Sequence, residues 1–249
     1  MTKSWLAGLT YMTEKSFQSD ISDNYSLILQ KVHESMKKAG RNSLKSPVRI
    51  MAVTKTVNVT RINEAVLCGI NLLGENRVQE FLEKSPEYAK FGKNTEVHFI
   101  GGLQSNKIRK IVDKVAMIHS VDGEKCLSEI DRQSGIIGKV SDVLIEVNVG
   151  EEVSKCGVAV GDVERLSEQS AKFANVRLRG LMAIPPPQES ERGFEVMAGL
   201  FERCRKSAGS EFDTLSMGMS GDYEKAILYG ANIIRLGSAL FGSRVYNNG

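Results

Sequence analysis

The sequence predicts a single (β/α)8 barrel of the TIM-barrel class, an α/β fold, preceded by an N-terminal helix. Eight short apolar runs alternate with segments of helical spacing, which is typical of parallel strands joined by crossover helices. The chain has 249 residues, the usual size of one such barrel. An open doubly wound sheet is the alternative, but it is expected to carry a Gly-x-Gly-x-x-Gly turn after an early strand, and the sequence has none.

The predicted elements follow one another at regular intervals. A helix is predicted over residues 22–39, with Gly40 as its C-terminal cap. The predicted strands cover residues 48–55, 71–75, 96–101, 117–121, 142–149, 176–184, 214–217 and 232–236. The helices between them are predicted at residues 60–68, 77–88, 106–115, 124–133, 162–173, 190–207 and 222–229, and a short tail starts at residue 239. No shift in composition marks a second domain, so we expect one domain over residues 22–249 and a disordered tail over residues 1–21.

Composition and charge argue against several classes of protein. The chain is 41% hydrophobic and 25% charged with a net charge of +3, and acids are interspersed with the basic residues. The densest basic stretch, residues 37–49, is interpreted as a helix end and a solvated linker, so no nucleic-acid partner is expected. No apolar run approaches the ~20 residues of a membrane span. The N-terminus lacks the features of a signal or transit peptide, so a cytoplasmic location is expected. A barrel of this size with an ordinary surface composition is expected to be a monomer.

Cysteines and histidines are scattered along the chain. The four cysteines form no Cys-x-x-Cys pair, and the three histidines are equally far apart, so no metal site is expected. Free, largely buried thiols suit a reducing compartment. His98, inside the third predicted strand, is interpreted as a satisfied core histidine or a supporting group rather than a proton carrier.

Lys55 ends the first predicted strand, an apolar and β-branched run. In a barrel the functional site lies at the carboxyl ends of the strands. A lysine there is partly desolvated, which disfavours the ammonium form and frees the amine to attack a carbonyl. The alternative is a strand-ending lysine whose charged end reaches water.

The segments after the seventh and eighth predicted strands are rich in glycine and serine. Ser216-Met-Gly-Met-Ser-Gly leaves the seventh strand, and Arg235-Leu-Gly-Ser leaves the eighth. Barrels seat phosphates at these two strands, where glycines let backbone N–H groups approach and hydroxyls donate. The alternative is that these residues only form tight turns.

Arg235 lies near the end of a central strand, where a guanidinium needs a partner. Either an acid in the barrel mouth or a ligand acceptor, such as a heterocyclic nitrogen, could supply it. A lysine that forms a Schiff base and a phosphate site in one barrel mouth together predict a phosphorylated aldehyde. Pyridoxal phosphate (PLP) fits, and so does a sugar phosphate in a Schiff-base aldolase. Met182 and Met219 are expected to pack, and could touch a flat ring.

Seven segments in order resemble the pyridoxal phosphate homeostasis protein family. They are Ala-Val-Thr-Lys-Thr (52–56), Gly-Glu-Asn-Arg-Val-Gln-Glu (74–80), His-Phe-Ile-Gly-Gly-Leu-Gln-Ser-Asn-Lys (98–107), Ser-Lys-Cys-Gly (154–157), Arg-Gly-Leu-Met-Ala-Ile-Pro (179–185), Leu-Ser-Met-Gly-Met-Ser (215–220) and Arg-Leu-Gly-Ser-Ala-Leu-Phe-Gly (235–242). The resemblance runs from about residue 22 to 246. It implies a barrel like the N-terminal domain of alanine racemase.

The resemblance also implies the cofactor and its contacts. PLP would be held as a Schiff base on Lys55. Three residues would hold the phosphate, namely Ser216, Gly237 and Ser238. Arg235 would face the pyridine nitrogen, which keeps that nitrogen unprotonated and weakens the ring as an electron sink. Asn76 and Met182 would line the cofactor.

The resemblance implies a protein that buffers PLP or delivers it to apo-enzymes, with no catalytic residue. The enzyme alternative is a fold-type-III activity such as an amino-acid racemase. Racemisation needs a second acid/base group on the opposite face of the ring, and nothing in the sequence places one there.

Overall fold

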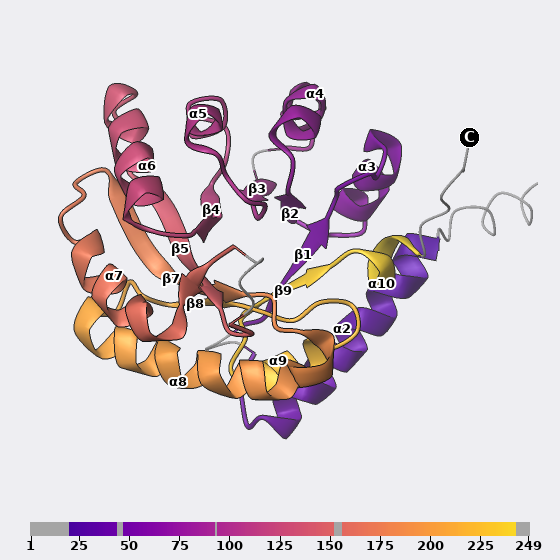
Figure 1. The fold of residues 1–249 in the computed structure, drawn as a ribbon. Coiled ribbons are helices and arrows are strands. Elements are labelled where there is room, and N and C mark those ends of the chain that lie inside the picture. The colour runs from indigo at the N-terminus through magenta and orange to yellow at the C-terminus, as the bar shows by residue number, and fades with distance from the viewer. Residues whose placement is uncertain (1–19, 44–46, 93, 152–155, 243–249) are drawn as a thin grey trace, which may run out of the picture.

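A closed barrel of eight parallel strands forms the centre of the molecule (Figure 1). The computed structural model describes residues 20–43, 47–92, 94–151 and 156–242. The barrel strands are β1 (Arg49–Val53), β2 (Leu72–Glu75), β3 (Glu96–Phe99), β4 (Met117–Val121), β5 (Ser141–Asn148), β7 (Val176–Ala183), β8 (Thr214–Ser216) and β9 (Ile233–Leu236). They follow one another around the barrel in this order, and β9 pairs with β1 to close it.

Helices surround the barrel on its outside (Figure 1). They are α2 (Asp20–Lys38), α3 (Val59–Leu67), α4 (Val78–Tyr88), α5 (Ser105–Ile108), α6 (Glu124–Ile136), α7 (Val163–Ser170), α8 (Ser190–Ala208), α9 (Tyr223–Leu228) and α10 (Ser238–Phe241). Because each crossover returns the chain to the same end, all eight strands have their carboxyl ends at one mouth of the barrel. None of the described helices has the length and hydropathy needed to cross a membrane.

The core has two parts because side chains alternate between the two faces of a strand. Val143, Ile145 and Val147 of β5 belong to the large cluster between strands and helices. Leu144 lies between them in sequence but packs in a separate cluster with Met117 and Met182. A second small cluster consists of Met51, Leu72 and Ile233. We infer that these two small clusters fill the inside of the barrel.

The predicted fold is confirmed, with differences at the ends of elements. The first predicted strand extends too far, because β1 ends at Val53 and Lys55 lies in the turn that follows. Helix α5 ends at Ile108, and turns replace the rest of the predicted helix. Strand β6 (Val158–Ala159), which pairs with β5, was not predicted, because two residues are too few to show alternation.

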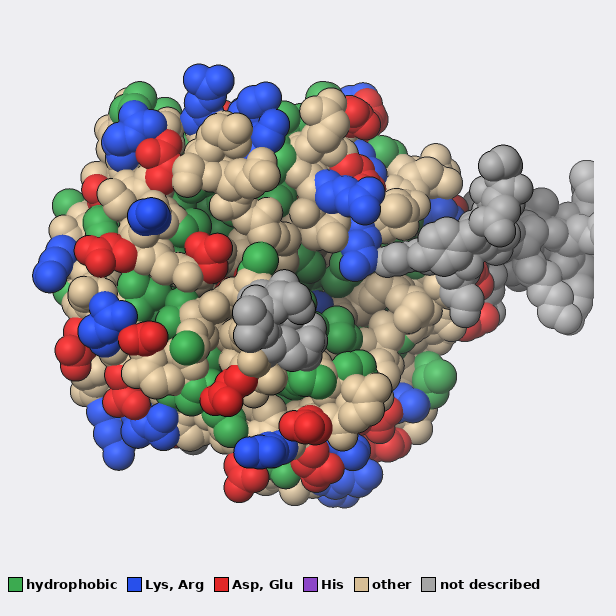
Figure 2. Space-filling view, viewed as in Figure 1, with side chains coloured by type: hydrophobic (Ala, Val, Ile, Leu, Met, Phe, Trp, Pro, Cys, Tyr) green, Lys and Arg blue, Asp and Glu red, His purple; other side chains and the backbone are tan. Residues whose placement is uncertain are grey.

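The N-terminal helix packs on the last elements of the chain. Helix α2 begins at Asp20, two residues before the predicted start, and Ile21 in its first turn is buried. The rest of the predicted tail lies outside the described residues. Asn24 donates to the carbonyl oxygen of Leu240 (3.0 Å). On the face shown in Figure 2, acidic and basic side chains are interspersed, as the composition predicts.

Candidate functional site

A cavity of about 420 Å³ lies at the carboxyl ends of β1 and β9. The turn after β1 contributes Lys55, which is half-buried, and the loop after β9 contributes Gly237 and Ser238. The parallel pairing of β1 with β9 brings these two segments together, although they are far apart in the sequence. Three of the site residues predicted from the sequence therefore line one cavity.

The loop after β8 lies against the loop after β9. Ser220 Oγ accepts hydrogen bonds from the backbone N–H groups of Gly237 (3.3 Å) and Ala239 (3.1 Å). Gly218 has a φ of +93°, and a Cβ there would lie 2.6 Å from the Cβ of Ala226, so the loop requires glycine. Backbone N–H groups and a hydroxyl are the donors that phosphate sites use. Ser220 was not among the predicted site residues, and its only sequence signal was a second hydroxyl in the same loop.

Arg235 is buried inside the barrel, with 3% of its surface exposed. Its Nη1 donates to Ser216 Oγ (2.8 Å) and its Nη2 to the carbonyl oxygen of Ala183 (2.8 Å). Burial lowers the pKa of Arg235 to about 10. Both partners are neutral, which disfavours the alternative that a carboxylate in direct contact holds this guanidinium. A buried cation with neutral partners suits an acceptor on a ligand. Ser216 thus contacts Arg235, and its role at a phosphate stays a prediction.

Glu146 on β5 is the acid whose charge most favours the ionised form of Arg235. Burial raises the pKa of Glu146 from its usual 4.5 to about 6, although the charge of Arg235 acts to lower it. The folded protein therefore holds this proton more tightly than the unfolded chain. The stability that results is present below about pH 4.5 and is lost as the pH rises through about 6.

Glu146→Gln is expected to raise the free energy of unfolding at pH 8 by about 1–2 kcal/mol, because the neutral amide avoids the desolvated carboxylate. At pH 4 the two proteins should be equally stable. Urea denaturation of both proteins at the two pH values measures the difference. A wild type that is the more stable protein at pH 8 would contradict this account.

Asn76 follows β2 and carries a buried acceptor. Its Oδ1 is buried and has no hydrogen-bond partner among the described residues. The backbone here is closely packed, because a Cβ at Gly101 would lie 2.0 Å from the carbonyl oxygen of Asn76. An unpaired buried acceptor is unfavourable, and a donor on a ligand would satisfy it. This supports the prediction that Asn76 belongs to a binding site.

The two predicted methionines differ in their surroundings. Met182 is fully buried and packs with Met117 and Leu144 inside the barrel. Met219 is half-buried, and its N–H donates to Asp222 Oδ1 (2.7 Å) at the start of α9. Packing is therefore established for Met182, and contact of either residue with a flat ring stays a prediction.

The two barrel histidines, His98 and His119, lie within hydrogen-bond distance of each other. His98 Nδ1 lies 2.9 Å from His119 Nε2, and His98 Nε2 lies 3.3 Å from Glu96 Oε2. Burial lowers the pKa of both histidines, which keeps them neutral. His98 is thus the satisfied core histidine that the sequence suggested. Among the described residues, no group of three or more His, Cys, Asp or Glu side chains could hold a metal ion.

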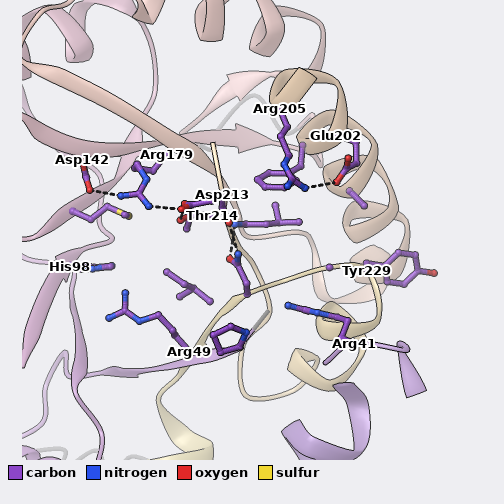
Figure 3. Close-up of a pocket in the computed structure, with 18 of the residues that line it drawn as sticks. Arg41, Arg49, His98, Asp142, Arg179, Glu202, Arg205, Asp213, Thr214 and Tyr229 are labelled. Atoms are coloured by element: carbon purple, nitrogen blue, oxygen red, sulfur yellow. Dashed lines mark hydrogen bonds and ion pairs between the residues drawn. The ribbon is translucent and has the colours of Figure 1, made fainter. Parts of the chain in front are cut away.

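A larger cavity of about 780 Å³ lies at the opposite, amino-terminal end of the barrel (Figure 3). Several of its charged side chains pair with one another. Arg179 donates to Asp142 (2.9 Å) and Asp213 (2.5 Å), and Arg49 donates to Glu96 (2.8 Å). Such pairs, formed between distant segments, could not be read from the sequence. This end of a barrel generally serves stability, so we place the candidate site at the carboxyl ends.

Known proteins resemble this chain over most of its length. The family model described as alanine racemase, N-terminal domain, matches residues 29–245. The pyridoxal phosphate homeostasis protein of Aquifex aeolicus is 38% identical over 228 residues, which cover 90% of this chain and 98% of that protein. PipY of Synechococcus elongatus PCC7942, solved with PLP bound, is 29% identical with a TM-score of 0.77, covering 90% of this chain and all of that chain (100%).

Alanine racemase of Corynebacterium glutamicum shows the same fold at greater distance. It is 15% identical with a TM-score of 0.65, and the match covers 92% of this chain and 62% of that chain. The resemblance inferred from the seven sequence segments is confirmed by the family match and by the relative from Aquifex aeolicus. The chain belongs to the pyridoxal phosphate homeostasis protein family, and its barrel is that of the alanine racemase N-terminal domain.

Proposed function

We propose that this protein binds PLP as a Schiff base on Lys55 and takes part in intracellular PLP homeostasis, buffering the cofactor and delivering it to apo-enzymes. The observation that carries the proposal is the cavity that Lys55 shares with Gly237 and Ser238. An amine and a phosphate-binding loop in one cavity suit a phosphorylated aldehyde. The names of the relatives and the PLP in PipY favour PLP over a sugar phosphate.

Each of the site residues would contact a particular part of the cofactor. The amine of Lys55 would hold the cofactor through its aldehyde group, as a Schiff base. Ser220 and the loop of Gly237 and Ser238 would hold the phosphate, a role supported by their contact with one another and by the cavity that the loop lines. Arg235 would meet the pyridine nitrogen, and the unpaired Oδ1 of Asn76 would accept a hydrogen bond from the cofactor's hydroxyl.

Holding the cofactor, without turnover, is part of the proposal. Bound PLP acts as an electron sink, and an arginine at its ring nitrogen weakens that sink. His98 and His119 are hydrogen-bonded to each other within the barrel strands, and burial keeps both neutral. The relatives are named as homeostasis proteins, which is not an enzyme name. The cytoplasmic location, the monomeric state and the single domain over residues 22–249 belong to the same proposal.

An absorption spectrum tests the binding of PLP. Protein mixed with PLP should develop a near-visible band, and borohydride reduction should leave a pyridoxyl group on the peptide that contains Lys55. A colourless protein, or a pyridoxyl group on another lysine, would contradict the proposal. An assay for alanine racemisation runs beside it, since activity in the purified protein would favour the enzyme alternative.

Delivery needs a separate measurement. The loaded protein is mixed with the apo form of a PLP enzyme in the presence of a scavenger that consumes free PLP. Recovery of enzyme activity at a rate that the scavenger does not reduce is expected for direct transfer. If the scavenger abolishes the recovery of activity, direct delivery is contradicted and buffering alone stays as the proposed function.

A further inference from the structure

The turn that carries Lys55 rests on an ion pair of helix α4. Lys84 Nζ lies 2.6 Å from Glu80 Oε1, one helical turn away. Lys84 also donates to the carbonyl oxygen of Thr54 (2.8 Å), and Glu80 accepts from the N–H of Thr56 (2.5 Å). These two backbone groups belong to the peptide bonds on either side of Lys55. One ion pair therefore holds both peptide groups that flank the Cα of Lys55.

This ion pair is largely buried. The side chains of Lys84 and Glu80 are 11% and 20% exposed, whereas a pair with this spacing usually lies on a helix surface. Lys84 also lies 3.5 Å from Glu75 Oε1, which accepts from Thr54 Oγ1 (2.6 Å) and Tyr88 OH (2.5 Å). Burial acts to raise the pKa of Glu80, but hydrogen bonds, first that from Lys84, lower it overall. Buried charges are unfavourable unless such partners are present, so this ion pair depends on all of these contacts.

The backbone beside Lys55 is in an unusual conformation. Thr56 has a φ of +62°, which β-branched residues rarely adopt. It is the third residue of a turn in which the N–H of Val57 donates to the carbonyl oxygen of Thr54 (3.0 Å), and glycine is usual at such a position. A strained backbone persists only where its surroundings fix it, and such residues cluster at ligand sites. The hydrogen bond from Thr56 to Glu80 is a restraint of that kind.

We propose that Glu80 and Lys84 are positioning residues for Lys55. They hold its backbone so that the amine is directed into the cavity shared with Gly237 before the cofactor arrives. Preorganisation of this kind improves affinity because less freedom is lost on binding. The inference rests on the proposed function, since it assigns these two residues to the retention of PLP. Neither residue touches the cofactor in this account, and both act through the turn.

The variants Lys84→Met and Glu80→Gln test the inference. Each should raise the dissociation constant of PLP about tenfold, as expected when one hydrogen bond to a charged group is lost. The double variant should be little worse than either single one, because the two residues act as a unit. Titration of the near-visible band measures the constants, and thermal unfolding of the protein without PLP reports on the fold.

Glu87 and Lys90 provide the matched control. They form an ion pair of the same length (2.6 Å) where the same helix ends, with Glu87 in the last turn of α4 and Lys90 two residues beyond it, but both side chains are exposed, at 44% and 67%. Glu87→Gln and Lys90→Met should bind PLP within twofold of wild type. Comparison with these variants separates the loss of any ion pair on α4 from the loss of the one that holds Lys55.

Each outcome decides between the two roles. If wild type develops the band and both Lys84→Met and Glu80→Gln bind within twofold of it, the ion pair serves only the fold and the inference is wrong. If Lys84→Met does not fold, the nearly isosteric Glu80→Gln decides alone. A wild type that never develops the band would contradict the proposed function itself, so the two failures are distinguishable.

Discussion

Replacing Lys55 with alanine is expected to abolish the near-visible band that the wild-type protein develops with PLP. Lys55 is the lysine that shares a cavity with the glycine-serine loop after β9. Without its amine no Schiff base can form there, so the band should vanish instead of weakening. Borohydride should then leave no pyridoxyl group on the protein. Absorption spectra and intact-protein mass spectrometry measure both losses.

Two further variants test whether the loss of the band is due to the missing amine of Lys55. Lys55→Arg keeps the positive charge but not the nucleophilic amine, so it should retain part of the phosphate affinity without the band. Lys110→Ala removes an exposed lysine and should leave both the band and the trapped mass unchanged. A Lys55→Ala protein that keeps the wild-type band would place the Schiff base elsewhere and overturn the site described above.

The strands could be predicted because each alternates apolar residues over four or more positions or forms a short apolar run. The same pattern led to a wrong end for the first strand, because it continues to Lys55 whereas β1 ends at Val53. The chain is already turning at Lys55, where the carbonyl oxygen of Thr54 and the N–H of Thr56 bond to side chains of α4. No local sequence pattern shows that α4 contacts this turn, because only the folded barrel brings the two together.

The site was partly predictable for a related reason. Ser216 lies within β8, where alternation puts it on the inside with Arg235. Ser220 lies beyond the strand, where alternation no longer applies, so the sequence could not show that its hydroxyl meets the amides of Gly237 and Ala239. Likewise, Glu80 and Lys84 have the spacing of an exposed surface pair, and only the fold reveals that they are buried.

Arg235→Met is expected to weaken PLP binding about ten- to a hundredfold while changing the stability of the protein without PLP only little. The loss of affinity corresponds to one hydrogen bond between the guanidinium and the pyridine nitrogen. The stability follows from desolvation. A pKa lowered from 12.5 to about 10 means that the buried charge costs about 3 kcal/mol at neutral pH.

Methionine fills a similar volume without a charge, but the two hydrogen bonds lost to Ser216 and Ala183 are made by a charged group and are worth about 1.5 kcal/mol each at the lower end of their range. The two contributions to stability therefore nearly cancel. Spectroscopic titration with PLP and thermal unfolding without it measure the two effects, with Arg177→Met, an exposed arginine at the other end of the barrel, as the control. Affinity within threefold of wild type would show that Arg235 does not contact the cofactor. A melting temperature several degrees lower would show that the fold itself needs the guanidinium. A large loss of affinity with little change in stability is the result expected of a residue kept for binding and not for the fold.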